Sequence, residues 1–144
     1  MKYLIAVDDD EVSWDAVEFA RRIVRPEDDI VVVNVAEPTY RYWAPAAGLT
    51  GVSAAAVDVG LEVEAATERA RVTLDRAVAA LPGRVEPRVE FGSPAEEICH
   101  AAEEEEADII ILGTHDRGAL KRIFGGSVSD DVVHKAPCPV LVVR

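Results

Sequence analysis

The stretch from Ile30 to Ala36 reads IVVVNVA, and six of its seven residues are apolar. Similar runs occur at 3–7 (YLIAV), 107–113 (ADIIILG) and 139–143 (PVLVV), and a weakly alternating one, RVEPRVEF, at 84–91. Strands that are apolar throughout are buried on both faces, which is typical of a parallel sheet covered by helices on each side. The sequence therefore predicts an α/β fold.

Helical patterns separate these runs. Between Leu61 and Leu81, apolar residues recur at spacings of three and four, which predicts an amphipathic helix. Its apolar stripe consists of Val63, Ala66, Ala70, Leu74, Ala77 and Leu81. A helix at 12–24 is expected to bury Val12, Ala16, Phe19, Ala20 and Ile23, and a short last helix is expected at 127–135.

A further helix is predicted for SPAEEICHAAEEEE, residues 93–106, with Ser93 as N-cap and Pro94 at the first helical position. With Glu96 three residues after the serine, the pattern is that of a capping box. The residues expected to face the sheet are Ala95, Ile98, Cys99 and Ala102. The closing run of four glutamates opposes the helix dipole, so this end is expected to fray.

Length and composition limit the possible partners. A chain of 144 residues buries roughly 70% of its unfolded surface, which predicts one domain over 1–144. A net charge of −12 disfavours nucleic acid and anionic membrane as partners, because phosphates are bound by Lys and Arg. No apolar run reaches 18 residues, and the start MKYLIAVDDDEV does not resemble a signal peptide. Cys99 and Cys138 lack a CxxC spacing and are expected to be reduced core residues of a cytoplasmic protein.

A long connection, roughly 37–60, follows the second strand and holds Tyr40, Tyr42 and Trp43. Connections of this length are usually functional or disordered. The three aromatic rings could stack on a ligand or a partner, or they could simply cover the rim of the sheet. Both interpretations stay open.

Polar and glycine residues follow the first and fourth strands. Asp8 comes after the first, and Gly113 ends the fourth and opens a loop that returns at Gly126-Ser127-Val128-Ser129. Ligands of parallel α/β sheets bind beyond the carboxyl ends of the strands, where helix N-termini offer backbone N–H groups to anions. The loop therefore predicts an anion site, with the alternative that Ser127 only caps the last helix and the glycines serve only the turn. It is not a Walker loop, because the Lys-Ser pair is missing.

The order of IAVD, VVVNVAE, GSPAEEICHAAEEEEADIIILGTH and GGSVSDDVVHKAPCPVLVV resembles the universal stress protein family over nearly the whole chain. The resemblance implies a single domain with an open, twisted, five-stranded parallel sheet of order 3-2-1-4-5, helices on both faces, and a homodimer. One branch of that family binds ATP through the motif G-x2-G-x9-G-[ST], and the other branch lacks it. On this sequence the motif positions fall at Gly113, Asp116 and Gly126-Ser127, so the middle glycine is an aspartate.

The resemblance also implies ligand contacts. It places Asp8 and Val35 beside the base and ribose, and the phosphates along Gly113, Gly126, Ser127, Val128 and Ser129. The expected ligand is ATP or another adenine nucleotide such as AMP. Arg117 could offset the charge of Asp116, or Mg²⁺ could bridge that carboxylate to the phosphates.

Two departures from the family pattern predict weak phosphate binding. A carboxylate at position 116, roughly 5 Å from a phosphate oxygen, costs about 3 kcal/mol at an effective dielectric near 20, or about two decades of affinity. The family's Gly-Ser after the first-strand aspartate reads Asp9-Asp10 here. These acids have a plainer interpretation too, since carboxylates in the first turn complement a helix dipole.

Two functions of different classes are compatible with these residues. The first is weak nucleotide binding by a cytoplasmic stress-response protein. The second is a homodimeric scaffold without a ligand, in which APCPVLVV, 136–143, pairs at the sheet edge with a second copy. An enzyme is not expected, because no nucleophile-base pair, Gly-x-Ser-x-Gly elbow or metal-ligand spacing occurs; His115 is the one histidine near the loop.

Overall fold

The computed structural model describes residues 1–37, 59–114 and 128–144. Its strands are β1 (Lys2–Ala6), β2 (Asp29–Ala36), β3 (Arg84–Phe91), β4 (Ile109–Gly113) and β5 (Val140–Val143). Its helices are α1 (Glu11–Ile23), α3 (Val59–Ala80), α4 (Pro94–Glu104) and α5 (Val128–Lys135). The predicted strands and helices are confirmed to within two residues at either end. The aromatic residues Tyr40, Tyr42 and Trp43 lie outside the described residues.

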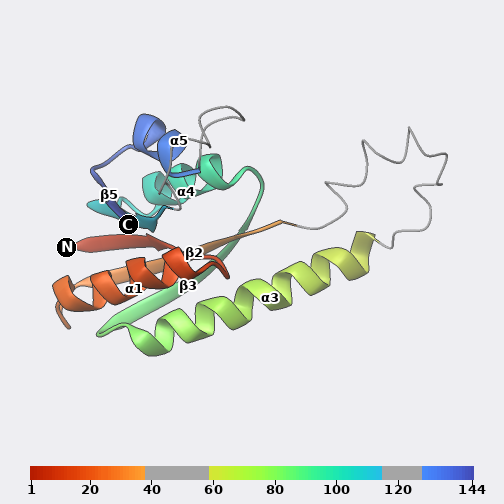
Figure 1. Cartoon of the computed structure of the whole chain (residues 1–144), viewed down its shortest axis with the longest axis horizontal. Coiled ribbons are helices and arrows are strands. Elements are labelled where there is room, and N and C mark those ends of the chain that lie inside the picture. The colour runs from red at the N-terminus through yellow and green to blue at the C-terminus, as the bar shows by residue number, and fades with distance from the viewer. Residues whose placement is uncertain (38–58, 115–127) are drawn as a thin grey trace.

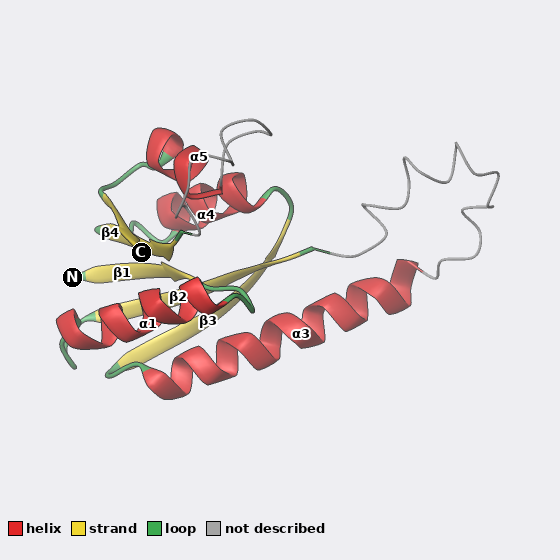
Figure 2. Ribbon diagram, in the orientation of Figure 1, coloured by secondary structure: helices red, strands yellow, loops and turns green. Residues whose placement is uncertain are grey.

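The strands form one sheet of order β3-β2-β1-β4-β5, and every neighbouring pair is parallel. In register, Leu4 of β1 lies between Val31 of β2 and Ile110 of β4. Helices α1 and α3 cover one face of this sheet, and α4 and α5 cover the other (Figures 1 and 2). Both the α/β class and the strand order are therefore confirmed.

None of the helices in the described part of the chain is long and apolar enough to cross a bilayer.

Each face of the sheet carries its own hydrophobic core. On the α1 and α3 side the strands contribute Tyr3, Ile5, Val7, Ile30, Val32 and Ile111. On the α4 and α5 side they contribute Leu4, Ala6, Val33, Ile110 and Leu112. Because neighbouring residues of a strand point to opposite faces, strands buried on both sides must be apolar at every position. That requirement is the physical reason for the continuous apolar runs in the sequence.

The helix faces agree with the predicted stripes in α3 but only in part in α1. In α3, the buried stripe residues are Ala66, Ala70, Leu74 and Ala77, with Leu81 just beyond its end. In α1, the buried residues are Ser13, Ala16, Val17 and Ala20, whereas Ile23 is 39% exposed. The prediction missed Ser13 because it used apolar residues only. The buried Ser13 hydroxyl donates a hydrogen bond to the carboxylate of Asp8.

Helix α4 begins as predicted, with Ser93 as its N-cap and Pro94 in its first turn. The predicted capping box is wrong in its chemistry, however, because the Ser93 side chain makes no capping hydrogen bond. Ala101 is fully buried against the sheet, while Cys99 is only partly buried at the side of the cluster. The buried face of α4 thus includes Ala101, whereas the predicted Cys99 lies at its edge.

The carboxyl end of α4 is closed by backbone hydrogen bonds, and the expected fraying of this end stays a prediction. The amide of Ala107 donates to the Ala102 carbonyl at 2.9 Å and that of Glu106 to the Glu103 carbonyl at 3.1 Å, which is a Schellman motif. Arg88 of β3 also forms ion pairs with Glu104 and Glu105. The motif requires a left-handed residue, and Glu106 occupies that position with φ of 50°.

Replacing Glu106 by glycine is expected to stabilise the protein by about 1 kcal/mol. The left-handed conformation costs an ordinary residue about 1–2 kcal/mol, and glycine adopts it freely, although a glycine also loses more entropy on folding. The exposed Glu103, in the last helical turn, is the matched control, since Glu103→Gly should destabilise by about 1 kcal/mol. Urea unfolding of both variants measures the two shifts, and a loss of stability in Glu106→Gly would contradict the assignment.

Candidate functional site

The carboxyl end of β4 meets the start of α5, and β1 lies beside β4 in the sheet. Thr114, directly after β4, receives a hydrogen bond of 2.9 Å from the Ser129 hydroxyl in the first turn of α5. Its amide donates to the Val143 carbonyl of β5 at 3.0 Å. On the other side, the amide of Val7 donates to the Val33 carbonyl of β2 at 2.9 Å. Strand ends and a helix start are therefore joined at one end of the sheet by buried hydrogen bonds.

Gly113 lies where β4 presses against the first turn of α1. A Cβ atom built on this glycine would lie 2.1 Å from the Val12 carbonyl oxygen and 3.1 Å from the Ser13 amide nitrogen. Real Cβ atoms do not approach backbone so closely, so a larger residue requires β4 and α1 to separate. The glycine expected beside a phosphate thus has a structural reason of its own. Its contact with a ligand stays a prediction.

Asp8 is held in a fixed orientation at the start of α1. Its Oδ1 accepts a hydrogen bond of 2.6 Å from the Ser13 hydroxyl and one of 2.9 Å from the Asp10 amide. Its own amide donates to the Ser13 oxygen at 3.1 Å. Asp8 itself is exposed. The carboxylate therefore occupies an amide at the start of α1 that an anion could otherwise bind.

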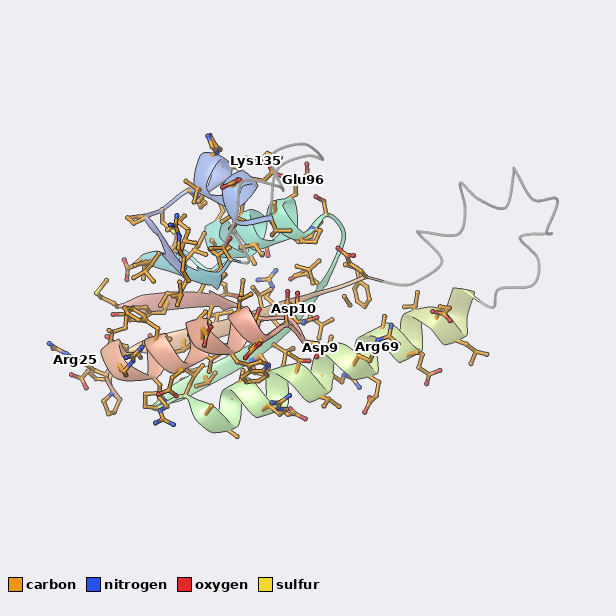
Figure 3. The ribbon with its side chains drawn as sticks, viewed as in Figure 1. Asp9, Asp10, Arg25, Arg69, Glu96 and Lys135 are labelled. Atoms are coloured by element: carbon orange, nitrogen blue, oxygen red, sulfur yellow. The ribbon has the colours of Figure 1, made fainter. Side chains whose placement is uncertain are left out.

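Asp9 is tied to α3 rather than to the strand ends. Its carboxylate accepts a hydrogen bond from the hydroxyl of Thr73, a residue only 1% exposed, and Figure 3 shows Asp9 between α1 and α3. Arg69, one turn earlier on α3, offers its carbonyl to the same hydroxyl at 3.2 Å. Asp10 is the N-cap of α1, with Glu11 in its first turn. The interpretation of these acids as partners of the helix dipole agrees with that position.

The other predicted site residues fall into two groups. Val35 packs against the core beneath α4 and α5, Val128 is 42% exposed, and Ser129 is buried with its hydroxyl donated to Thr114. The rest lie outside the described residues: Asp116, Arg117, Gly126 and Ser127, together with His115. The structure thus brings Gly113 and Ser129 together through Thr114 and places Asp8 at the neighbouring strand end.

Four polar residues in this region were not predicted. They are Ser13, Asn34, Thr73 and Thr114, and all four are buried. Asn34 carried the clearest signal, because it interrupts an otherwise apolar strand, and its amide donates to the Val7 carbonyl at 2.8 Å. That bond fixes the ends of β1 and β2 relative to each other. Residue spacing could not identify Thr73, because its partner Asp9 is distant in the sequence. It could not identify Ser13 either, because a short serine side chain gives no sign that it bonds to Asp8.

A surface hollow in the described part of the chain lies at the opposite, amino end of the sheet. It is lined by Lys2, Asp29, Ile30, Val31, Arg84 and Glu86. Its two cations and two carboxylates balance, so it offers no charge preference for a ligand. Among the described residues, no group of three or more His, Cys, Asp or Glu side chains is placed to hold a metal ion.

The fold and this junction define an open, doubly wound α/β protein whose crevice residues gather at the carboxyl ends of the inner strands. More narrowly, the chain belongs to the universal stress protein family, whose family model matches residues 1–144.

Similar proteins come from bacteria and archaea. A universal stress protein of Thermus aquaticus is 55% identical over 53 residues, which are 37% of this chain and 39% of that protein. One from Methanothermobacter thermautotrophicus is 40% identical over 88 residues, 57% of this chain and 60% of that protein. The matched segments thus span less than two thirds of these curated relatives. The solved structure of MJ0577, a protein of Methanocaldococcus jannaschii, has a TM-score of 0.75 and 27% identity, covering 99% of this chain and 94% of that one.

Proposed function

We propose that this protein binds an adenine nucleotide, weakly, at the carboxyl ends of β1 and β4, and that it does so in the stress response of the cell interior. The observation that carries the proposal is the hydrogen bond between Ser129 and Thr114, which fixes the start of α5 beside the end of β4. A helix start held there presents its first amides toward an anion. The proposed role is binding rather than catalysis.

Solved relatives support an adenine nucleotide as the ligand class. One universal stress protein was solved in complex with cAMP, and one from Archaeoglobus fulgidus in complex with dAMP. Their identities to this chain are 21% and 24%, with TM-scores of 0.66 and 0.64, so the likeness itself is one of fold. The residues of this chain must therefore supply the argument for the same ligand here.

Charge favours a monophosphate over ATP in this chain. Asp8, Asp9 and Asp10 are exposed at the end of β1, and Asp8 is held there by Ser13. An added phosphate charge roughly 10 Å from one carboxylate costs about 1.7 kcal/mol at a dielectric near 20, before salt screening reduces it. ATP carries more charge than AMP, so ATP should bind more weakly than AMP. Mg²⁺ should reduce this difference in affinity.

Calorimetric titration with AMP, cAMP and ATP, with and without Mg²⁺, tests this function. We expect AMP and cAMP to bind about tenfold more tightly than Mg²⁺-free ATP, which corresponds to about 1.4 kcal/mol. GMP serves as the control for base recognition. No heat with any of the nucleotides at millimolar concentration would refute nucleotide binding.

A homodimer formed through β5 is the second candidate function. β5 is the edge strand of the sheet, and each residue from Val140 to Val143 is half-buried. The carbonyls of Pro139 and Val143 accept hydrogen bonds from the amides of Ile110 and Thr114, whereas the alternation of a parallel ladder turns the backbone of Val142 outward. An apolar edge with outward N–H and C=O groups is suited to pairing with a second copy.

Replacing Val142 by proline is expected to dissociate this dimer. The substitution removes an outward N–H group and leaves the ladder to β4 intact. Val142→Thr keeps the N–H group and is the matched control. Sedimentation at tens of micromolar should show a dimer for the wild type and the threonine variant and a monomer for Val142→Pro, and a wild-type monomer would exclude β5 pairing.

A further inference from the structure

The two cysteines of the chain lie in one packed cluster, on the face of the sheet opposite α1 and α3. Cys99 belongs to α4, and Cys138 precedes β5; both are partly buried, and both pack against the cluster that includes Ile98, Ala102 and Val132. They are 39 residues apart in sequence, since 138 minus 99 is 39. The fold, rather than a local motif, brings them to the same place.

An exposed ion pair marks where α5 and α4 meet. Lys135 Nζ, at the end of α5, lies 3.6 Å from Glu96 Oε1 of α4, and Figure 3 shows the two residues side by side. Cys99 is three residues after Glu96, and Cys138 is three residues after Lys135. Residues three apart on a helix lie on the same face, so Cys99 follows Glu96 along the side of α4 that meets α5. Cys138 lies in the segment between α5 and β5, which packs against the same cluster as Cys99.

The electrostatics of the two thiols agree with this position. Burial raises the pKa of Cys99, and Cys138 is close enough to raise it further, while Lys135 lowers it. Burial also raises the pKa of Cys138. Both groups are therefore mainly protonated at neutral pH and react slowly, and Lys135 favours Cys99 as the attacking thiolate.

We propose that Cys99 and Cys138 form a thiol oxidation site, in which a disulfide oxidant such as glutathione disulfide joins them into one intramolecular disulfide that links α4 to the start of β5.

The chemistry proceeds in two thiol–disulfide exchanges. The Cys99 thiolate attacks one sulfur of glutathione disulfide, which forms a mixed disulfide and releases one glutathione thiolate. The Cys138 thiolate then attacks the protein sulfur of that mixed disulfide and releases the second glutathione. The two protons lost by the cysteines are taken up by the two glutathione thiolates. The protein is oxidised by two electrons, and glutathione disulfide is reduced by two.

The test is the intact mass of the folded full-length chain after incubation with glutathione disulfide at pH 8 and acid quenching. The wild type should lose two hydrogens and carry no glutathione, and dithiothreitol should reverse the change. Cys138→Ser has no second thiol and should keep one bound glutathione, as should Cys99→Ser. Oxidation should quicken about tenfold per pH unit below the thiol pKa, because the thiolate is the nucleophile.

Thermal unfolding of the oxidised and reduced protein gives a second readout. A disulfide that closes a loop of about 40 residues should raise the Tm of the oxidised wild type by roughly 10 °C over the reduced protein. Neither serine variant should show that rise on oxidation. Two glutathione adducts on one wild-type chain, or a disulfide between two chains on a non-reducing gel, would overturn the proposal, because each shows that the thiols do not reach one another.

Discussion

Gly113→Ala is expected to lower the Tm of the protein by roughly 4–10 °C. The added Cβ would lie 2.1 Å from the Val12 carbonyl oxygen and 2.5 Å from its carbon, both of which are backbone atoms. A side chain could rotate away at little cost, but backbone cannot, so β4 and the first turn of α1 must move apart. Because the clash is with backbone, the overpacking cost should lie near about 3 kcal/mol, and the net loss of about 2–2.5 kcal/mol corresponds to this fall in Tm.

An opposing effect is smaller. Alanine loses less backbone entropy than glycine on folding, which favours the variant by about 0.5–1 kcal/mol. The steric term is larger, so destabilisation is the expected net result. Nucleotide affinity should fall as well, because the first turn of α1 carries Ser13, which orients Asp8.

Differential scanning fluorimetry measures the Tm shift, and Gly113→Ser supplies the comparison. Serine adds one more atom at the same place and should be at least as damaging. An unchanged Tm in both variants would show that α1 does not pack against the end of β4 as described. A stable variant that lost only nucleotide binding would instead assign Gly113 to the ligand alone.

Much of the fold could be predicted because its signals are local. An apolar run such as IVVVNVA reports burial on both faces of a strand, and the stripe in α3 reports its contact with the sheet. The inward face of α1 could not be predicted fully, since its buried Ser13 depends on a hydrogen bond to Asp8. Periodicity detects apolar residues only, so a polar residue that is buried with its partner escapes it.

The location of the candidate site could be predicted from the sequence, but the roles of its residues could not. Asp8, Gly113 and Ser129 were predicted from their places after strands and before a helix, and the structure puts all three at one end of the sheet. Their roles are less predictable, because they depend on contacts between distant residues. Gly113 meets α1 about 100 residues earlier in the chain, and the hydroxyl expected on a phosphate, that of Ser129, is donated to Thr114. Residue spacing predicts where the site lies, but only the packing of the fold distinguishes ligand contacts from internal hydrogen bonds.

Asp116→Gly is expected to tighten nucleotide binding by about two decades. Residue 116 lies outside the described residues, and the prediction rests on the resemblance that places it at the middle glycine of the family's nucleotide motif. Removing a carboxylate roughly 5 Å from a phosphate oxygen removes a repulsion of about 3 kcal/mol at an effective dielectric near 20. The acids at the end of β1 remain in the variant, so a preference for AMP over ATP should remain, although a narrower one.

A series of ligands and variants separates charge from backbone freedom. Asp116→Asn removes the charge without adding glycine's conformational range, so most of the gain should already occur in that variant. Adenosine has no phosphate and should bind the wild type and both variants equally, whereas the gain for ATP should exceed that for AMP. Asp75→Asn, at an exposed position on α3, controls for the change in net charge. Titration calorimetry measures each affinity, and equal affinities of the wild type and Asp116→Gly for AMP would show that this carboxylate lies outside the field of the phosphate.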